Sequence, residues 1–243
     1  MNRICGKPGR GWYNRCMKKV AIFDIDGTIF RSSLLIELVN MLIERGTFPD
    51  SAREEYEKEH SEWLDRKGDY QNYIEAIVKV FMKNLKGVYY GDFMDSADNV
   101  IEQQRHHTYR YTRDLIAELK SEGYYLLAIS HSPKSILEKF CKHLGFDKVY
   151  GKLYETGATG CFTGVILEDH LISNKANVVR RAVEKEGLTL KGSVGVGDTE
   201  SDISFLEMTD RAICFNPNSK LYRYAKLNGW EVVVERKDVV YKL

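Results

Sequence analysis

Two carboxylates and a hydroxyl follow a short apolar run near the start of the chain. Asp24 and Asp26 come directly after the apolar residues 20–23, and Thr28 follows them. The run is too short for a helix and has no polar alternation, which predicts a strand buried on both faces of a parallel sheet. Ligands bind beyond the carboxyl ends of such strands. Carboxylates held two residues apart repel each other there, so the motif predicts a bound cation, while Thr28 can present its hydroxyl to an anion.

A second acidic pair lies far downstream. Asp198 and Asp202 follow another short apolar stretch, and between the two pairs come Ser130, after the apolar residues 126–129, and Lys175, at the start of a predicted helix. By itself, the first motif is also compatible with an ordinary Asx turn at the end of a strand. Four such elements in this order are far more specific than any one of them.

With these four elements the sequence resembles the haloacid dehalogenase (HAD) superfamily of hydrolases, in its subgroup similar to phosphoserine phosphatase. The resemblance implies an α/β fold: a Rossmann-like parallel sheet with helices on both faces, plus an inserted α-helical cap. It also implies a phosphatase that depends on Mg²⁺ and hydrolyses a small phosphate monoester through an aspartyl-phosphate intermediate.

The resemblance assigns roles to the four aspartates. Asp24 is the implied nucleophile, and Asp26 is the acid that protonates the leaving alkoxide and then activates water. The implied Mg²⁺ ligands are Asp24, the backbone carbonyl of Asp26, and Asp198, while Asp202 completes or orients the metal shell.

Substrate phosphate is assigned to Lys175, Ser130, Thr28 and His131. Ser130 has a second interpretation, because a hydroxyl at a strand end can instead cap the following helix; the four-part pattern favours phosphate. Asp198 has the same alternative as the N-cap of its own helix. Lys175 in a first helical turn opposes the helix dipole, which favours an anionic partner; the alternative is a lysine that simply extends into water, as most first-turn lysines do.

The elements that position these residues follow from periodicity. Apolar spacing predicts helices over residues 34–42, up to about 66, around 73–81 and over 92–104. So long a helical insertion cannot sit within the sheet. Residues 32–110 are therefore predicted to form the helical cap, with residues 17–31 and 111–243 as the α/β core; an ordinary helical subdomain is the alternative. Further strands are predicted at 124–129, 193–196, 212–215 and 232–234, with a hairpin within 147–168.

The amino-acid composition limits the classes of binding partner and the cellular compartment to be expected. The net charge of +1 gives no strong attraction to nucleic acid, and no apolar run is long enough to span a membrane. The five cysteines are odd in number and lack a Cys-x-x-Cys pair, which indicates reduced thiols and a cytoplasmic protein. We expect a small phosphorylated metabolite as the partner, and a monomer or homodimer. Residues 1–16, rich in glycine and unopposed basic residues, are predicted to be a disordered leader before a natural start at Met17, with a basic anchoring tail as the alternative.

The chain differs from the family pattern at positions that bear on substrate recognition. Phosphoserine phosphatases carry a glutamate where this chain has Ser33, and Glu37, one turn further on, is the available substitute. Residues 130–132 read Ser-His-Ser in place of Ser-Gly-Gly, and Ser201 stands in place of asparagine. Phosphoserine is therefore one possible substrate among several.

Other functions fit parts of the pattern. A response-regulator receiver also forms an aspartyl-phosphate, but it lacks the helical insertion. A phosphotransferase or phosphomutase of the same fold, or a non-catalytic phosphate-binding protein, is the main alternative. The presence of Asp26 favours attack by water, because related ion-pumping ATPases have no acid at that position.

Overall fold

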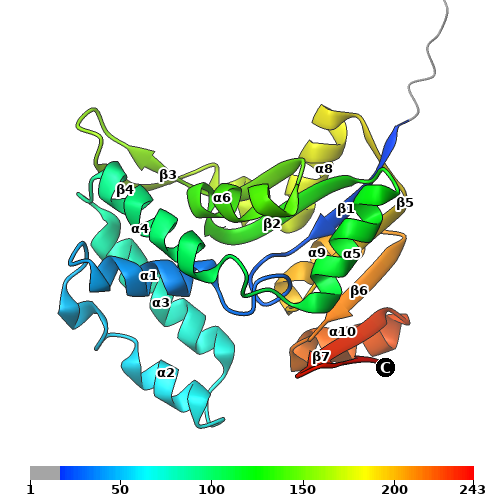
Figure 1. Cartoon of the computed structure of the whole chain (residues 1–243), viewed down its shortest axis with the longest axis horizontal. Coiled ribbons are helices and arrows are strands. Elements are labelled where there is room, and N and C mark those ends of the chain that lie inside the picture. Colours follow the sequence, from blue (N-terminus) through cyan, green and yellow to red (C-terminus); the bar gives the residue numbers. More distant parts are fainter. Residues whose placement is uncertain (1–16) are drawn as a thin grey trace, which may run out of the picture.

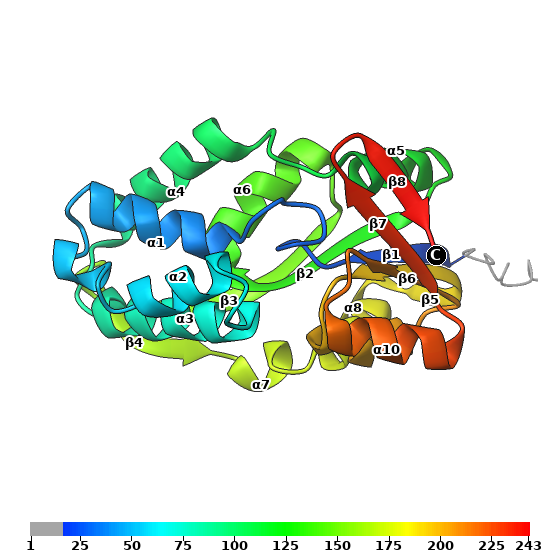
Figure 2. The same ribbon diagram turned by 90° about the horizontal axis from the view of Figure 1, so that it is seen from below.

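A single eight-stranded sheet runs through the molecule in the order β4-β3-β2-β1-β5-β6-β7-β8. The computed structural model describes residues 17–243, so the predicted leader lies outside the described residues. All neighbouring strands from β3 to β7 are parallel, and only the outer pairs β3–β4 and β7–β8 are antiparallel. Helices cover both faces of the sheet (Figure 2). The predicted α/β fold with a parallel sheet is thus confirmed.

The elements have the following bounds. The strands are β1 (Lys18–Phe23), β2 (Tyr125–Pro133), β3 (Lys148–Thr156), β4 (Phe162–Leu167), β5 (Leu188–Gly197), β6 (Arg211–Phe215), β7 (Glu231–Arg236) and β8 (Val239–Lys242). The α-helices are α1 (Leu34–Glu44), α2 (Glu57–Leu64), α3 (Tyr70–Leu85), α4 (Tyr90–Gln104), α5 (Arg110–Ser121), α6 (Lys134–Leu144), α7 (Asp169–Ile172), α8 (Lys175–Glu186), α9 (Ile203–Leu206) and α10 (Ser219–Asn228). Two short 3₁₀ helices are η1 (Asp50–Ala52) and η2 (Glu200–Asp202).

The central strand β1 is buried on both faces, as its unbroken apolar run predicts. Val20 and Ile22 pack into a core with α8, α9 and α10, whereas Ala21 and Phe23 pack into the larger core with α1, α5 and α6. Successive side chains of a strand point to opposite faces, so each face of β1 needs its own layer of helices. Figure 2 shows these two layers above and below the strands.

The position of β1 brings the site residues together. β1 lies between β2 and β5, and Phe23 pairs with Ala128 on one side and with Val196 on the other. All three strands run in the same direction, so the residues that follow them meet at one edge of the sheet. The Asp24 N–H group continues the ladder by donating to the Val196 carbonyl over 2.9 Å.

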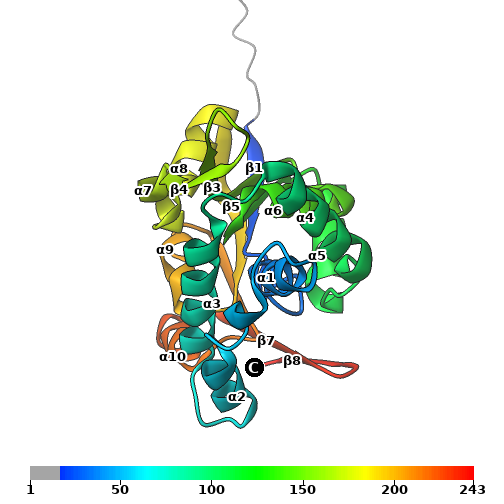
Figure 3. The ribbon, with the colours of Figure 1, turned by 90° about the vertical axis from the view of Figure 1, so that its left-hand side faces the viewer.

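Helices α1 to α4 lie together beyond the carboxyl ends of β1 and β2 (Figures 1 and 3). The β3–β4 hairpin pairs with the loop before α4. The Phe162 N–H group donates to the Val88 carbonyl over 2.9 Å, and Tyr89 forms a β-bridge with Cys161. The rings of Phe93 and Phe162 meet edge to face 5.0 Å apart. The hairpin thereby holds the helical segment over the sheet edge.

Two strands extend by four or more residues beyond one end of their predicted ranges. β2 continues beyond residue 129 to Pro133, and β5 begins at Leu188 rather than at 193. Both extensions contain polar or glycine residues, whose side-chain pattern does not distinguish a strand from a loop. Within residues 17–243, none of the helices combines the length and apolar character needed to cross a membrane.

Candidate active site

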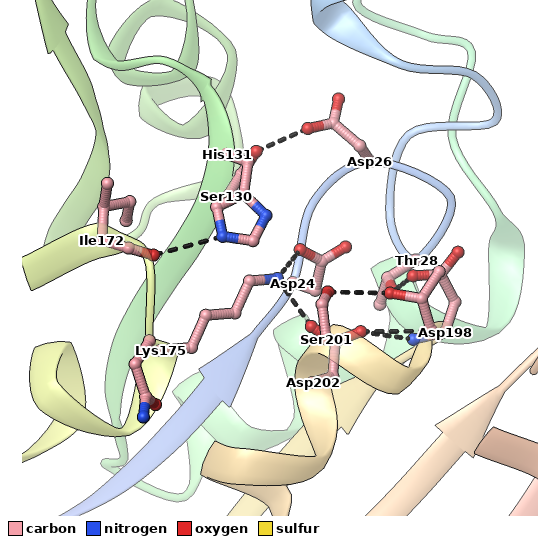
Figure 4. Close-up of polar contacts among 12 residues, drawn as sticks. Asp24, Asp26, Thr28, Ser130, His131, Ile172, Lys175, Asp198, Ser201 and Asp202 are labelled. Atoms are coloured by element: carbon pink, nitrogen blue, oxygen red, sulfur yellow. Dashed lines mark hydrogen bonds and ion pairs between the residues drawn. The ribbon is translucent and has the colours of Figure 1, made fainter. Parts of the chain in front are cut away.

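A buried lysine links two of the predicted carboxylates. Lys175 is the first residue of α8, which begins there because the Asn174 side chain accepts the Ala176 N–H group over 3.0 Å. Its Nζ atom donates to Asp24 Oδ1 over 2.5 Å and to Asp202 Oδ1 over 2.6 Å (Figure 4). Burial alone would lower the pKa of Lys175, but the carboxylates of Asp202 and Asp24 raise it above its usual value. The ammonium group therefore stays charged.

Three carboxylates converge beside this lysine. Asp24, Asp198 and Asp202 each offer an oxygen within 4.8 Å of the others, and Asp24 and Asp202 are buried. Burial, opposed by Lys175 and reinforced by Asp202 and Asp26, raises the pKa of Asp24 to about 8. Burial, then Asp24 and Asp202, raise the pKa of Asp198 well above its usual value. One ammonium group does not offset the mutual repulsion of three ionised carboxylates, so a divalent cation would favour their ionised forms.

Asp202 is held by the backbone of its own turn. Its Oδ2 atom accepts the N–H groups of Asp198 over 2.9 Å and of Thr199 over 3.1 Å. Thr199, and not Asp198, is the N-cap of η2, in a reciprocal capping box with Asp202. The interpretation of Asp198 as a helix cap is therefore wrong. Asp198 Oδ1 instead accepts the Thr28 hydroxyl across the site over 3.3 Å.

The hydrogen bonds of the three carboxylates show which of their oxygens are available to a metal. Within residues 17–243, Oδ2 of Asp24 and Oδ2 of Asp198 accept no hydrogen bond, whereas both carboxylate oxygens of Asp202 are engaged. Carboxylate oxygens are the ligands that Mg²⁺ prefers, and Mg²⁺ usually binds through one or two of them together with water and substrate. The donor set therefore fits Mg²⁺, with Asp202 orienting rather than completing the site.

Glycines permit the close approach of the acidic loops. Gly27 has φ of +80°, and a Cβ atom at this position would overlap Asp198 Oδ2. At Gly197 a Cβ atom would lie 2.6 Å from Asp202 Oδ2. Any larger residue at either position would push a carboxylate out of the cluster.

Asp26 faces a different part of the site from Asp24. Its carboxylate accepts the Leu34 N–H group at the start of α1 over 2.6 Å, the Ser130 hydroxyl over 2.5 Å and the Ser132 hydroxyl over 2.8 Å. Figure 4 shows Asp26 turned toward the end of β2, away from Lys175. The side chain is thus fixed by three donors from two elements.

Ser130 lies inside β2 and does not cap α6. The N-cap position of α6 is Pro133, which makes no side-chain cap bond, and the Ser130 oxygen accepts the Ser132 N–H group over 2.9 Å. The capping interpretation of Ser130 is therefore wrong. Its hydroxyl is aligned on Asp26, and its role in phosphate binding stays a prediction.

His131 lines the site as a neutral ring. Its Nε2 atom lies 3.1 Å from the Ile172 carbonyl. Burial, followed by the charges of Lys175 and Lys152, lowers the pKa of His131 to about 4. A neutral imidazole can donate a hydrogen bond to phosphate but adds no positive charge to the predicted phosphate site.

Replacing His131 by glutamine is expected to flatten the pH dependence of stability between pH 6.5 and 4. The unfolded chain protonates this histidine near 6.5, whereas the folded state does so near 4. The unfolded state binds more protons in this window, so the native protein loses up to about 3 kcal/mol of unfolding free energy as the pH falls through it. Urea denaturation in EDTA at several pH values measures the effect. The exposed His143, changed to glutamine, is the matched control, and equally steep profiles for both variants would contradict the assignment.

A cavity of about 210 Å³ opens above the carboxylates. Its floor includes Asp24, Asp198 and Lys175, and its walls come from the helical segment and from β3. Sequence reasoning missed the wall residues. They are Leu35, Tyr70, Gln71, Ile74, Val78, Lys152 and Tyr154. Period-two alternation would have placed residues 152 and 154 on one face of β3. It would not have shown which cavity that face lines.

Tyr70 lines the cavity that holds the carboxylates. Burial, then the charges of Asp26 and Asp198, raise the pKa of Tyr70 above its usual value. The ring also packs on Trp63, with ring centroids 5.4 Å apart. Tyr70 therefore both packs against the helical segment and lines the cavity.

Ser33, which stands in place of the family's glutamate, and Glu37, its possible substitute, line different cavities. Ser33 lines the cavity above Asp24, whereas Glu37 lines a neighbouring cavity of about 380 Å³ together with Trp63 and Tyr73. Glu37 therefore does not take the place of Ser33. Ser201, the residue in place of the family's asparagine, also lines the cavity above Asp24, and its hydroxyl lies 2.9 Å from that of Thr199.

The parallel sheet, the helical segment over its carboxyl edge and the lysine-bridged carboxylates define an α/β enzyme with an acidic active site. The family of haloacid dehalogenase-like hydrolases matches residues 21–207. The match covers most of the chain, so the protein belongs to this family, which confirms the resemblance. It is a HAD-family phosphatase similar to phosphoserine phosphatase.

Individual relatives support the same family. Histidinol-phosphatase from Neisseria meningitidis serogroup C is 26% identical over 231 residues, which cover 89% of this chain and 99% of the relative. Phosphoserine phosphatase from Methanocaldococcus jannaschii is 23% identical over 225 residues, which cover 91% and 94%. A solved phospho-aspartyl intermediate analogue of phosphoserine phosphatase has the same fold, with a TM-score of 0.62 at 20% identity over 91% and 95% of the two chains. Several other relatives are matched over only part of their length, for example 48% of one and 39% of another.

Proposed function

We propose that the protein is a Mg²⁺-dependent phosphatase that hydrolyses a small phosphate monoester through an aspartyl-phosphate on Asp24. The observation that carries the proposal is the buried Lys175, bonded to Asp24 and Asp202 beside Asp198. This arrangement supplies a nucleophilic oxygen, a cation for the phosphoryl group and a carboxylate set for a divalent ion. Mg²⁺ held by Asp24 and Asp198 would neutralise charge on the substrate phosphate and on the carboxylates.

The proposed reaction has two chemical steps, in which Asp24, Asp26 and Lys175 have separate roles. In the first step, an Asp24 oxygen attacks phosphorus, the bond from phosphorus to the leaving oxygen breaks, and Asp26 gives its proton to that oxygen. In the second step, Asp26 takes a proton from water as the water attacks phosphorus. The bond from phosphorus to Asp24 then breaks and inorganic phosphate leaves. Lys175 stabilises negative charge on the phosphoryl oxygens in both steps.

The surrounding elements serve this chemistry. Residues 32–110 act as a cap that excludes water and selects the leaving group, because α1 and α3 supply much of the cavity wall. Ser130, Thr28 and His131 are proposed to contact the phosphate with Lys175. The protein is proposed to act in the cytoplasm, since Cys141, Cys161 and Cys214 are free thiols.

Metal removal tests the proposal. Phosphate release from a panel of phosphorylated metabolites, phosphoserine included, is expected with Mg²⁺ and is expected to stop in EDTA and return when Mg²⁺ is added back. Calorimetric titration of Mg²⁺ measures binding separately. A folded protein that binds Mg²⁺ but releases no phosphate from any compound would favour the phosphotransferase, phosphomutase or binding-protein alternatives instead.

A further inference from the structure

Lys152 faces the cavity that holds the nucleophile. It lies on β3 opposite Pro133 of β2, and it lines the cavity above Asp24 together with Tyr154, two residues further along the same face. The residue is half-buried. Its ammonium group forms no hydrogen bond and no ion pair within the part of the chain that the structure describes, unlike Lys148 on the same strand, which pairs with Glu186.

The rest of the cavity gives Lys152 no partner. Apart from the catalytic carboxylates and Lys175, it is the one charged side chain among the described residues that line this space. Leu35, Ile74 and Val78 contribute apolar side chains to the wall. The nearby His131 is neutral, because burial, Lys175 and Lys152 lower its pKa to about 4. Glu37 lines the neighbouring cavity instead.

An ammonium group in this setting suits an anionic ligand. A half-buried cation that lacks a protein carboxylate must be satisfied by water or by a bound anion. The phosphoryl group in transfer belongs at Asp24, where Lys175 donates its hydrogen bonds. Lys152 stands on another element, β3, in the same cavity, whose volume of about 210 Å³ has room for a phosphate and a short carbon chain.

On the basis of the proposed phosphatase function, we propose that Lys152 is a specificity-determining residue that binds a second anionic group on the leaving-group side of the substrate. The group is a carboxylate or a second phosphate. An amino group has no carboxylate partner in this cavity beyond the catalytic ones, so the preferred class is an acidic phosphate monoester rather than an amino-alcohol phosphate.

A matched set of three-carbon phosphates tests the assignment. Propyl phosphate carries neither group, 2-aminopropyl phosphate carries the amine, 3-phosphooxypropanoate carries the carboxylate and phosphoserine carries both. Propane-1,3-diol bisphosphate replaces the carboxylate with a second phosphate. The wild-type protein is expected to prefer the carboxylate or bisphosphate compound over propyl phosphate, and the amine is expected to add nothing.

The Lys152→Met variant is expected to lose this preference. The ratio of kcat/KM for the acidic compound to kcat/KM for propyl phosphate should fall by about ten- to a hundredfold, the range for one hydrogen bond to a charged group. The change should be in KM, and Lys152→Arg should restore part of the ratio. Lys148→Met, on the same strand outside the cavity, is the matched control and should behave as wild type. An unchanged ratio in Lys152→Met, or a wild-type preference for the amine, would overturn the proposal.

A binding measurement separates this inference from the proposed function. Calorimetric titration of 3-phosphooxypropanoate and propyl phosphate into the Asp24→Asn protein with Mg²⁺ needs no turnover. Tighter binding of the acidic compound that is lost when Lys152→Met is added would support the Lys152 assignment even for a protein that hydrolyses nothing. Equal affinities in the presence of normal phosphatase activity would refute the assignment and leave the phosphatase function intact.

Discussion

Replacing Asp24 by asparagine is expected to abolish phosphate release, with kcat lower by at least about 10⁴-fold. The amide cannot attack phosphorus, and it offers a single carbonyl oxygen where the carboxylate beside Lys175 offers two. The same substitution should eliminate the acid-stable, base-labile phosphoenzyme that a brief incubation of wild-type protein with ³²P-labelled substrate is expected to form.

The folded state should survive this change. Burial and the neighbouring Asp202 raise the pKa of Asp24, so an uncharged group is tolerated at this position, and Lys175 keeps its bond to Asp202. We expect a melting temperature no lower than that of the wild type in EDTA. Asp114→Asn, at an exposed residue paired with Arg113, is the matched control and should keep full activity. Substantial phosphate release by the Asp24 variant would contradict its role as nucleophile.

Replacing Lys175 by methionine is expected to lower the unfolding free energy by about 3 to 5 kcal/mol at neutral pH, and to remove activity as well. The methionine fills a similar volume but leaves Asp24 and Asp202 buried without their shared cation, from which they lie 2.5 and 2.6 Å away. Urea denaturation in EDTA measures the loss. Lys191→Met, at an exposed lysine, is the matched control and should change stability by less than about 0.5 kcal/mol.

The lost stability should depend on pH with a defined sign. Without the lysine, burial favours the protonated form of Asp24 in the folded state, so the folded pKa of Asp24 lies above the unfolded value of 3.8. The folded variant then binds more protons than the unfolded chain in this window, and its stability should rise as the pH falls from neutral toward 4. A variant as stable as the wild type at neutral pH would show that the lysine bridge contributes nothing to the fold.

The residues of the candidate active site could be predicted because each belongs to a local pattern. Asp24, Lys175, Asp198 and Asp202 each follow a recognisable strand end or open a helix, and parallel strands bring their carboxyl ends to one edge. The order of these motifs along the chain was therefore sufficient to predict the family and the sheet that assembles them.

The roles of Ser130 and Asp198 could not be predicted in the same way, because their hydrogen-bond partners are distant in the sequence. Ser130 and Asp198 both had a plausible use as helix caps, because capping needs only a polar side chain before a helix. The folded chain places Asp26 within 2.5 Å of the Ser130 hydroxyl and Thr28 within 3.3 Å of Asp198, each more than 100 residues away in sequence. These long-range bonds, absent from any local pattern, decided against capping.

By itself, the sequence determined the parallel α/β sheet, the helical insertion and the set of residues that could carry phosphoryl chemistry. Only the tertiary structure decided which residues surround a substrate. Tyr70 and Lys152 belong to segments 82 residues apart that meet because the β3–β4 hairpin pairs with the helical segment over the sheet edge. A cavity forms between packed elements, and its lining follows from their relative placement, which periodicity within any single element does not specify.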